Sequence, residues 1–254
     1  MPGNELEIGR FLFMNIGKFT LPHIGQLVNI GAPNPSCPGF IPITSLSEIN
    51  LLSSEDSRKK ADIYINGKGV SLKQSGASFP YNRLQRANLR DVFVSLGFEN
   101  VEEMLETADN EVRMFHQGVL TFRSRPWIEF FNENDFRALL EFLMMKGSPN
   151  VGMSPHPAEL ILEAPSANIS STNIEVYTFD EYFERYKDEL CIGIRRQWVG
   201  QASDSEHGRA LGLVRKPGNA PWVYRDIVGE PRSGWRSGFP KEAMRTVYFL
   251  MIEK

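Results

Sequence analysis

The alternation of apolar and polar residues is clearest in residues 61–74 and predicts a β-hairpin there. Asn66-Gly67-Lys68-Gly69 is a turn signal typical of a two-residue hairpin loop. If Gly67 and Lys68 form the turn, Asp62 on the first strand faces Lys73 on the second, with Cβ atoms about 5 Å apart. Side chains on a strand alternate between its two faces. One face then carries Ile63, Ile65, Val70 and Leu72 and is the predicted core face, and the other carries Asp62, Tyr64, Ser71 and Lys73.

The same reading along the rest of the chain predicts a mixture of helices and strands. Helical spacing predicts a short capped helix near 46–52 and helices near 82–96, 101–115, 135–146 and 180–187. Extended segments are predicted at 158–162, 173–178, 190–199, 210–215, 221–228 and 246–252, with Pro217-Gly218-Asn219-Ala220 as the turn of a hairpin. We therefore expect an α/β fold with a mixed β-sheet flanked by helices and a β-rich C-terminal part.

A segment rich in Gly and Pro, residues 148–157, is the predicted boundary between the two parts. We expect a core in residues 1–150 and a β-rich part in 151–254, or one continuous domain that includes both. Residues 206–254 carry nine Lys and Arg against five Asp and Glu, a net charge of +4, which leaves −7 on residues 1–205. Positive charge is therefore concentrated at the C-terminal end.

The composition excludes few functional classes. The chain has 254 residues, 41% of them hydrophobic, and a net charge of −3, as in an ordinary folded protein without a global basic signature. Cys37 and Cys191 lie far apart in sequence, which argues against a disulfide scaffold or a cysteine zinc site. No stretch approaches 18 consecutive apolar residues, so we expect neither a membrane span nor a signal peptide, and a cytoplasmic protein.

The predicted hairpin resembles the active-site core of the PD-(D/E)xK nucleases, and of the type II restriction endonucleases in particular. In that pattern an Asp opens one strand and, after a turn, an acid, an apolar residue and a Lys follow on the next. Lys59-Lys60-Ala61-Asp62-Ile63 is similar to the first part, and Val70-Ser71-Leu72-Lys73-Gln74 to the second. The resemblance is confined to this segment.

The resemblance implies a Mg²⁺-dependent, site-specific endonuclease that cleaves double-stranded DNA without a nucleotide cofactor. Asp62 would hold the metal ion together with the Leu72 carbonyl, and Lys73 would be the catalytic lysine. Such residue types suit the chemistry, because carboxylates bind a hard cation and a lysine stabilises the charge that develops on the phosphate or activates the attacking water. If the enzyme cuts both strands of a palindrome, two-fold symmetry favours a homodimer.

One position departs from the family pattern. Ser71 stands where the family has Glu or Asp, and a serine hydroxyl is a poor Mg²⁺ ligand. Another acid must then complete the site, and Glu48, Glu55 and Asp91 are candidates, with Glu48 or Glu55 preferred. Glu48 also fits a capping box, Ser45-Leu46-Ser47-Glu48. We expect Ser71 and Gln74 to be neighbours of the site.

Two groups of arginines are candidate DNA contacts. Arginine binds phosphate groups and guanine edges with its planar guanidinium. The groups are Arg83, Arg86 and Arg90, at helical spacing in the predicted helix 82–96, and Arg225, Arg232 and Arg236, near the glycines of the C-terminal part. The first group also fits an ordinary solvated face. Trp222 and Trp235, near the second group, are expected in the core.

Other interpretations of the sequence remain open. An Asp–Lys pair also occurs on ordinary solvated sheets, where it contributes at most about 1 kcal/mol. The chain is then a non-catalytic DNA-binding protein that recognises a sequence or a modification. An RNA or structure-specific nuclease is a further possibility. Asp204-Ser205-Glu206-His207 resembles part of an HNH-like site, although the sequence offers no further ligands for it.

Overall fold

The computed structural model of the chain describes residues 5–53, 58–76 and 81–254. They form two compact units, each made of two separate segments. Unit 1 contains Met1–Ser78 and Leu140–Glu189, and unit 2 contains Phe79–Leu139 and Leu190–Lys254. The chain passes from one unit to the other at several points, and none of them is the expected boundary near residue 150. A loop-rich composition marks a turn in the chain, but it does not reveal which distant strand the following segment will join.

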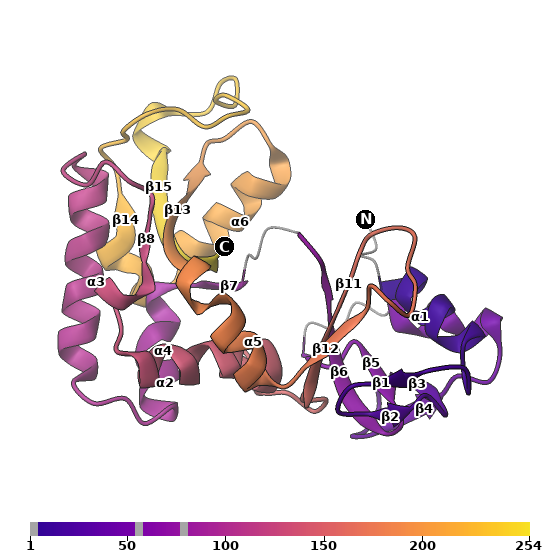
Figure 1. Ribbon diagram of the computed structural model, residues 1–254. Coiled ribbons are helices and arrows are strands. Elements are labelled where there is room, and N and C mark those ends of the chain that lie inside the picture. The colour runs from indigo at the N-terminus through magenta and orange to yellow at the C-terminus, as the bar shows by residue number, and fades with distance from the viewer. Residues whose placement is uncertain (1–4, 54–57, 77–80) are drawn as a thin grey trace. The chain divides into compact units, whose positions relative to one another are not determined.

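Unit 1 is built on a six-stranded mixed sheet (Figure 1). Only β11 and β6 run parallel, and all other neighbouring strands are antiparallel. The mixed sheet agrees with the predicted fold class. The strand order is β12 (Glu175–Tyr177), β11 (Leu160–Ala164), β6 (Lys68–Gln74), β5 (Ile63–Ile65), β3 (Ile30–Pro33) and β4 (Phe40–Pro42).

The predicted hairpin is present as β5 and β6, but its register differs from the prediction. Ile63 pairs with Val70 and Ile65 with Lys68, so the turn is Asn66-Gly67 and not Gly67-Lys68. Both turn residues have positive φ, 50° and 82°, as a type I′ turn requires. The change shifts each pairing by two residues, which keeps every side chain on its predicted face. Asp62 and Lys73, however, are not directly opposite one another.

Both faces of this sheet are covered. Helix α1 (Glu5–Met14) and the 3-10 helix η1 (Leu46–Ser53) pack on the predicted core face. That core contains Ile8, Leu12, Ile49, Leu52, Ile63, Ile65, Val70 and Leu72, all of them buried. Helix α5 (Phe179–Tyr186) contacts β11 on the opposite face through Tyr182 and Tyr186. The polar face of the hairpin is therefore not a solvated surface, and Ser71 on it is only 2% exposed.

Short elements complete unit 1. Two small ribbons pair β1 (Thr20–Leu21) with β2 (Gly25–Gln26) and β9 (Gly147–Ser148) with β10 (Gly152–Met153). A π-helical turn, η3 (Phe142–Lys146), and a 3-10 turn, η4 (Lys187–Glu189), follow α4 and α5.

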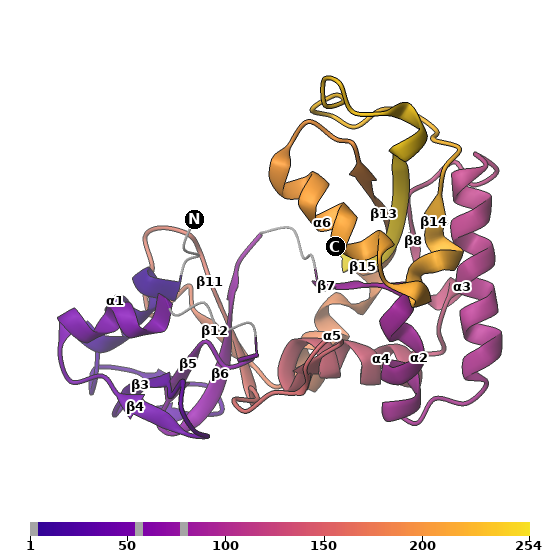
Figure 2. The ribbon, with the colours of Figure 1, turned by 180° about the vertical axis from the view of Figure 1, so that it is seen from behind.

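Unit 2 has an antiparallel sheet covered by helices on both faces (Figures 1 and 2). Its strands are β14 (Val223–Tyr224), β15 (Arg245–Glu253), β13 (Cys191–Val199) and β8 (Ser124–Pro126) in this order, with β7 (Tyr81–Leu84) also paired to β15. Helix α6 (Asp204–Val214) packs against Val247 on one face. Helix α3 (Val101–His116) contacts Tyr248, the next residue along β15, on the other.

The remaining elements of unit 2 include three differences from the prediction. Helix α2 (Arg86–Ser95) begins later than expected because residues 81–84 form β7, and α4 (Glu133–Glu141) agrees with the prediction. The predicted strand 210–215 is wrong, since it is part of α6. The predicted hairpin turn is also wrong, because Pro217–Trp222 is a 3-10 helix, η5. Two further 3-10 turns are η2 (Trp127–Glu129) and η6 (Lys241–Ala243).

Both errors have local causes. The Ser203 hydroxyl accepts a hydrogen bond from the Glu206 backbone N–H and caps α6. The buried Asn219 amide accepts from the Ala87 backbone N–H at 2.9 Å and donates to the Leu213 carbonyl at 2.9 Å, which holds η5 between two helices. These contacts favour helical turns over a hairpin.

Three further expectations concern single features. Trp222 is fully buried, as predicted, and Trp235 is half-buried against Trp198. Neither Cys37 nor Cys191 forms a disulfide within the described parts of the chain. Within the described parts of the chain, no helix combines the length and the hydropathy that a membrane span requires.

Candidate active site

Asp62 is held against the neighbouring strand β6 at the start of β5. Its backbone N–H donates to the Val70 carbonyl at 2.9 Å. Its carboxylate oxygen Oδ2 accepts hydrogen bonds from the Leu72 backbone N–H at 2.8 Å and from the Ser71 hydroxyl at 3.4 Å. The carboxylate is therefore oriented by the backbone of the strand that carries the lysine.

Lys73 reaches Asp62 through a serine. The Lys73 ammonium donates a hydrogen bond to Ser71 Oγ at 2.8 Å, and that hydroxyl in turn donates to Asp62. A hydroxyl group has one proton to donate and lone pairs to accept, so Ser71 can serve both partners. The residue that departs from the family pattern thus lies between the two residues that match it.

Lys73 lies in a poorly hydrated and acidic environment. Burial lowers the pKa of its ammonium, while Asp62, Glu5 and Glu163 act in the opposite direction. Two of these acids, Glu5 and Glu163, were not predicted from the sequence. They extend the site beyond the hairpin.

Glu5 is the first residue of α1 and is half-buried. Burial raises the pKa of its carboxyl group, and the Asp62 carboxylate raises it further, while Lys59 and Lys73 lower it. A carboxyl group whose pKa is raised by a neighbouring carboxylate lies in a negative environment that favours a bound cation. Glu5 is therefore the structural candidate for the acid that Ser71 does not supply.

Glu163 lies beside Lys73, because the parallel register of β11 and β6 pairs these two residues. Its carboxylate accepts hydrogen bonds from the Tyr186 hydroxyl at 2.7 Å and from the Tyr182 hydroxyl at 3.4 Å. Burial and the Glu163 charge raise the pKa of Tyr186 to about 12, so this tyrosine remains a donor at neutral pH. Glu163 is thus a fixed, buried negative charge next to the lysine.

A second lysine approaches the same region. Lys60 donates a hydrogen bond to the Leu143 carbonyl at 2.7 Å. Burial, followed by the charge of Lys73, lowers the pKa of Lys60 to about 8, and Asp62 opposes that shift. The neighbourhood of Asp62 therefore contains two lysines as well as the acids.

Of the predicted candidates for the missing acid, Glu48 has a different role in the structure. Oxygen Oε2 of Glu48 accepts hydrogen bonds from the Thr44 backbone N–H and hydroxyl and from the Ser45 backbone N–H, which is the capping role that the sequence also allowed. Glu55 lies outside the described residues. Asp91 is an exposed residue of α2 in unit 2. Gln74 is exposed at the end of β6.

The sequence contained a signal for one of the two missed acids. Glu163 interrupts an otherwise apolar run, Leu-Ile-Leu-Glu-Ala, and all five residues of β11 are buried. A buried charge within such a strand needs a partner, which is a reason to look for one. Glu5 has no comparable signal, because an acid in the first turn of a helix is common.

The acids fit Mg²⁺ only as a small site. Among the residues that the structure describes, no group of three or more His, Cys, Asp and Glu side chains has the arrangement of a metal site. Mg²⁺ is usually held by one or two carboxylates and keeps several waters. The Asp62 and Glu5 carboxylates match that number.

The first group of predicted DNA-binding arginines has partners within unit 2. Arg86 makes two hydrogen bonds with the Asp109 carboxylate, at 2.6 and 3.1 Å, and Arg90 forms an ion pair with Glu102. Both contacts link α2 to α3. Arg83 is on β7 and not on the helix, and its guanidinium lies over the Phe249 ring at 5.1 Å. The three arginines therefore do not form the predicted stripe on one helix.

The second group lies in the segment between β14 and β15. Arg225 and Arg232 are exposed there, whereas Arg236 forms an ion pair with Asp204. Gly229, Gly234 and Gly238 all have positive φ, so this segment changes direction repeatedly. Contact of these arginines with DNA stays a prediction.

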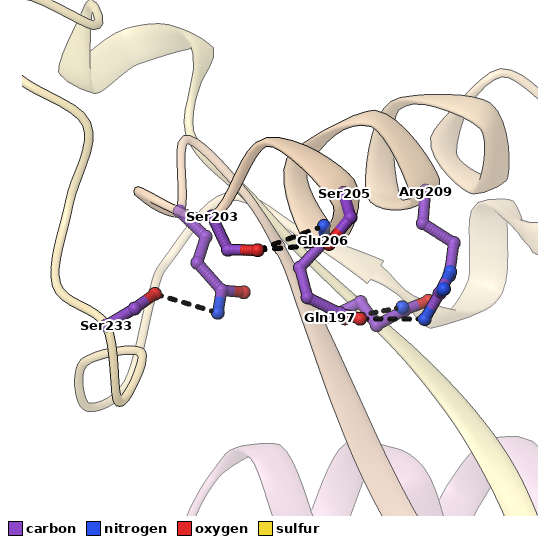
Figure 3. Close-up of polar contacts among 7 residues, drawn as sticks. Gln197, Ser203, Ser205, Glu206, Arg209 and Ser233 are labelled. Carbon is purple, nitrogen blue, oxygen red and sulfur yellow. Dashed lines mark hydrogen bonds and ion pairs between the residues drawn. The ribbon is translucent and has the colours of Figure 1, made fainter. Parts of the chain in front are cut away.

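The segment that resembles an HNH-like site is the start of α6 (Figure 3). The close-up shows Ser203 and Ser205 beside Glu206, whose carboxylate accepts from Gln197 at 2.8 Å and from Arg209 at 2.7 Å. His207 is 9% exposed, and its Nδ1 accepts from the Gly200 backbone N–H at 2.9 Å. These contacts explain the polar residues as helix cap and packing groups.

Comparisons with known proteins add little. No protein-family model matches the chain. No curated protein matches it either. Among solved structures, the chain has a likeness to restriction endonuclease MspI in complex with its cognate DNA, with 7% identity and a TM-score of 0.31 over 98% of this chain and 78% of the other. A TM-score of this size is too low to show a shared fold, so we draw neither fold nor function from this likeness.

Proposed function

We propose that the protein is a Mg²⁺-dependent endonuclease that cleaves double-stranded DNA at specific sites, as a type II restriction enzyme does. The observation that carries the proposal is the hydrogen-bonded series Asp62–Ser71–Lys73 on two adjacent strands. The acids Glu5 and Glu163 lie close enough to influence the Lys73 ammonium. An isolated surface ion pair would need neither the buried serine nor the additional acids.

Asp62 and Glu5 would hold the metal ion, together with the Leu72 carbonyl. A bound Mg²⁺ would neutralise phosphate charge and lower the pKa of a coordinated water. Asp62 suits this role because the bonds from β6 fall on Oδ2 and fix the orientation of the carboxylate. A preorganised ligand needs little rearrangement when the cation binds.

Lys73 would act on the phosphate or on the attacking water. Ser71 and Glu163 restrict its position, the first through a hydrogen bond and the second from the adjacent strand. A lysine that is poorly hydrated yet surrounded by acids can stabilise developing negative charge more strongly than one in water. Glu163 is a positioning residue in this account.

Digestion of a mapped plasmid tests the proposal directly. Incubation with Mg²⁺ should give discrete fragments, and EDTA should abolish them. Degradation without defined fragments, or cleavage of RNA, would favour an RNA or structure-specific nuclease. Intact plasmid together with measurable DNA binding would favour the non-catalytic DNA-binding alternative.

We further propose that the active form is a homodimer. One site of this kind cuts one strand, and two copies related by a two-fold axis would cut both strands of a palindrome. Analytical ultracentrifugation with and without duplex DNA checks this, and a monomer in both conditions during double-strand cleavage would contradict it.

A further inference from the structure

We propose that unit 2 carries a binding surface for nucleic-acid phosphates, formed by Arg123, Arg195, Arg196 and Arg232. We call these four residues the arginine surface. The sequence assigned no role to the first three. The inference rests on the proposed function only for the choice of DNA as the nucleic acid.

The backbone brings the first three arginines together. Arg123 immediately precedes the edge strand β8, and its carbonyl accepts a hydrogen bond from the Ile194 backbone N–H at 2.8 Å. Ile194 is followed on β13 by Arg195 and Arg196. The pairing of β8 with β13 therefore places Arg123, which adjoins the edge strand, beside Arg195 and Arg196, whose side chains leave β13 on opposite faces of the sheet.

The fourth arginine reaches this place on the segment between β14 and β15. Arg196 Nη1 donates a hydrogen bond to the Val228 carbonyl at 2.6 Å. A Cβ atom on Gly229 would lie 3.8 Å from the same nitrogen. Arg232 follows three residues later on the same segment, which turns at Gly229 with φ of 84°.

The positive charges of the other three arginines act on the Arg123 guanidinium. Partial loss of hydration lowers the pKa of Arg123, and Arg195, Arg196 and Arg232 lower it further, while Glu253 acts in the opposite direction. Glu253 is already engaged, since it accepts from both Arg195 and Ser124. Neighbouring positive charges repel, and a bound anion would relieve that repulsion.

Two of the arginines have their donors available. Arg123 and Arg232 are exposed, and the guanidinium of neither forms a hydrogen bond or ion pair with a residue in the described parts of the chain. The other two are fixed, because Arg195 binds Glu253 and Arg196 lies over the Trp198 ring at 4.7 Å. Two free guanidinium groups beside two fixed ones suit a ligand with phosphate oxygens, which arginine binds in a bidentate manner.

A nucleic-acid backbone fits this surface better than a single small anion. Residues 190–254, which supply three of the four arginines, carry eleven Lys and Arg against six Asp and Glu. A phosphate backbone offers a row of charges, and each neutralised phosphate releases counterions and adds to the salt dependence of binding. Contacts of this type would fix the position of the protein on DNA without selecting a sequence.

Fluorescence anisotropy with a labelled DNA duplex tests the inference in EDTA, where cleavage does not interfere. We expect Arg123→Ala/Arg232→Ala to weaken binding at least about tenfold and to reduce the slope of log K against log salt concentration by about two. Arg215→Ala, which removes an exposed charge from the end of α6, is the matched control and should bind within about twofold of wild type. Thermal melts should be alike for all variants.

The outcomes separate this inference from the proposed function. Unchanged affinity and salt slope in the double variant, or no duplex binding by the wild-type protein, would overturn the arginine surface even if the plasmid is cut. Weakened binding in the double variant would support the surface even if no cleavage occurs. Competition by polyglutamate as strong as that by DNA would indicate an acidic protein partner and overturn the assignment to nucleic acid.

Discussion

Replacement of Asp62 by Asn removes a negative charge from the candidate site while it keeps the shape of the side chain. The Asp62 oxygen Oδ2 accepts from the Leu72 backbone N–H at 2.8 Å and from Ser71 at 3.4 Å, and an amide carbonyl oxygen can accept both bonds. Charge-assisted bonds become neutral ones, which costs about 1 kcal/mol of folding free energy. We therefore expect a folded protein with a slightly lower melting temperature.

The effect of Asp62→Asn on cleavage should be much larger. Loss of one preorganised electrostatic group from an active site raises the barrier by about 3–4 kcal/mol, which corresponds to a rate reduction of about 10²–10³-fold. Binding to DNA in EDTA should be unaffected, because that measurement needs no metal ion. The variant should thus separate binding from chemistry.

Single-turnover cleavage of a supercoiled plasmid with excess protein and Mg²⁺ measures this effect. Asp91→Asn is the matched control, since Asp91 is an exposed acid on α2 in unit 2. A cleavage rate for Asp62→Asn within threefold of wild type, in a folded protein, would refute the role of this carboxylate. An equal loss in Asp91→Asn would show that the assay reports a general effect of charge.

Three further substitutions test the surroundings of the site. Tyr186→Phe removes the 2.7 Å hydrogen bond to the buried Glu163, and urea unfolding should show a loss of about 1–3 kcal/mol; wild-type stability would contradict the contact. Gly69→Ala places a methyl group against the Pro157 carbonyl oxygen and should lower the free energy of unfolding by about 1–3 kcal/mol in the same assay. An unchanged free energy of unfolding would contradict this close approach. Backbone N–H groups lower the pKa of the Glu48 carboxyl group. The ionised carboxylate therefore stabilises the fold at pH values above the usual carboxyl pKa, and this stabilisation is lost as the pH falls through the lowered pKa. Glu48→Gln should flatten this part of the stability–pH curve, and coincident curves would argue against the cap.

The hairpin illustrates what alternation can and cannot predict. The two faces of residues 61–74 were predicted correctly because the side-chain period of a strand is two and the core face is continuous. The register of the two strands was not predicted correctly, because Asn66-Gly67 and Gly67-Lys68 are both plausible turns in the sequence. The positive φ of Asn66 distinguishes them, and only the structure provides it.

The additional acids of the site depend on long-range pairing. Glu163 reaches Lys73 only because β11 joins the sheet next to β6 in a parallel register. Asp62 affects the pKa of Glu5 because α1 packs on the same unit as the hairpin. Neither relation has a sequence pattern of its own, since a parallel partner is supplied by a distant segment. The same limit explains why the predicted boundary near residue 150 separates segments that share one sheet.

The arginines show a related limit. Helical spacing suggested that Arg86 and Arg90 face the solvent or DNA, but the neighbouring helix α3 offers Asp109 and Glu102. Spacing within one helix cannot reveal the charges of the helix that packs beside it. Conversely, Arg195 and Arg196 received no role from the sequence because Arg123 and Arg232 come from distant segments.

The most direct test of the account is the single-turnover cleavage rate of Lys73→Ala with Mg²⁺, measured beside that of Lys68→Ala. Lys68 is on the same strand, but its ammonium donates to the His23 carbonyl at 2.7 Å and not to Ser71. The account predicts that Lys73→Ala folds, binds DNA and cuts at least about 100-fold more slowly, while Lys68→Ala cuts at nearly the wild-type rate. Full cleavage by folded Lys73→Ala would contradict it.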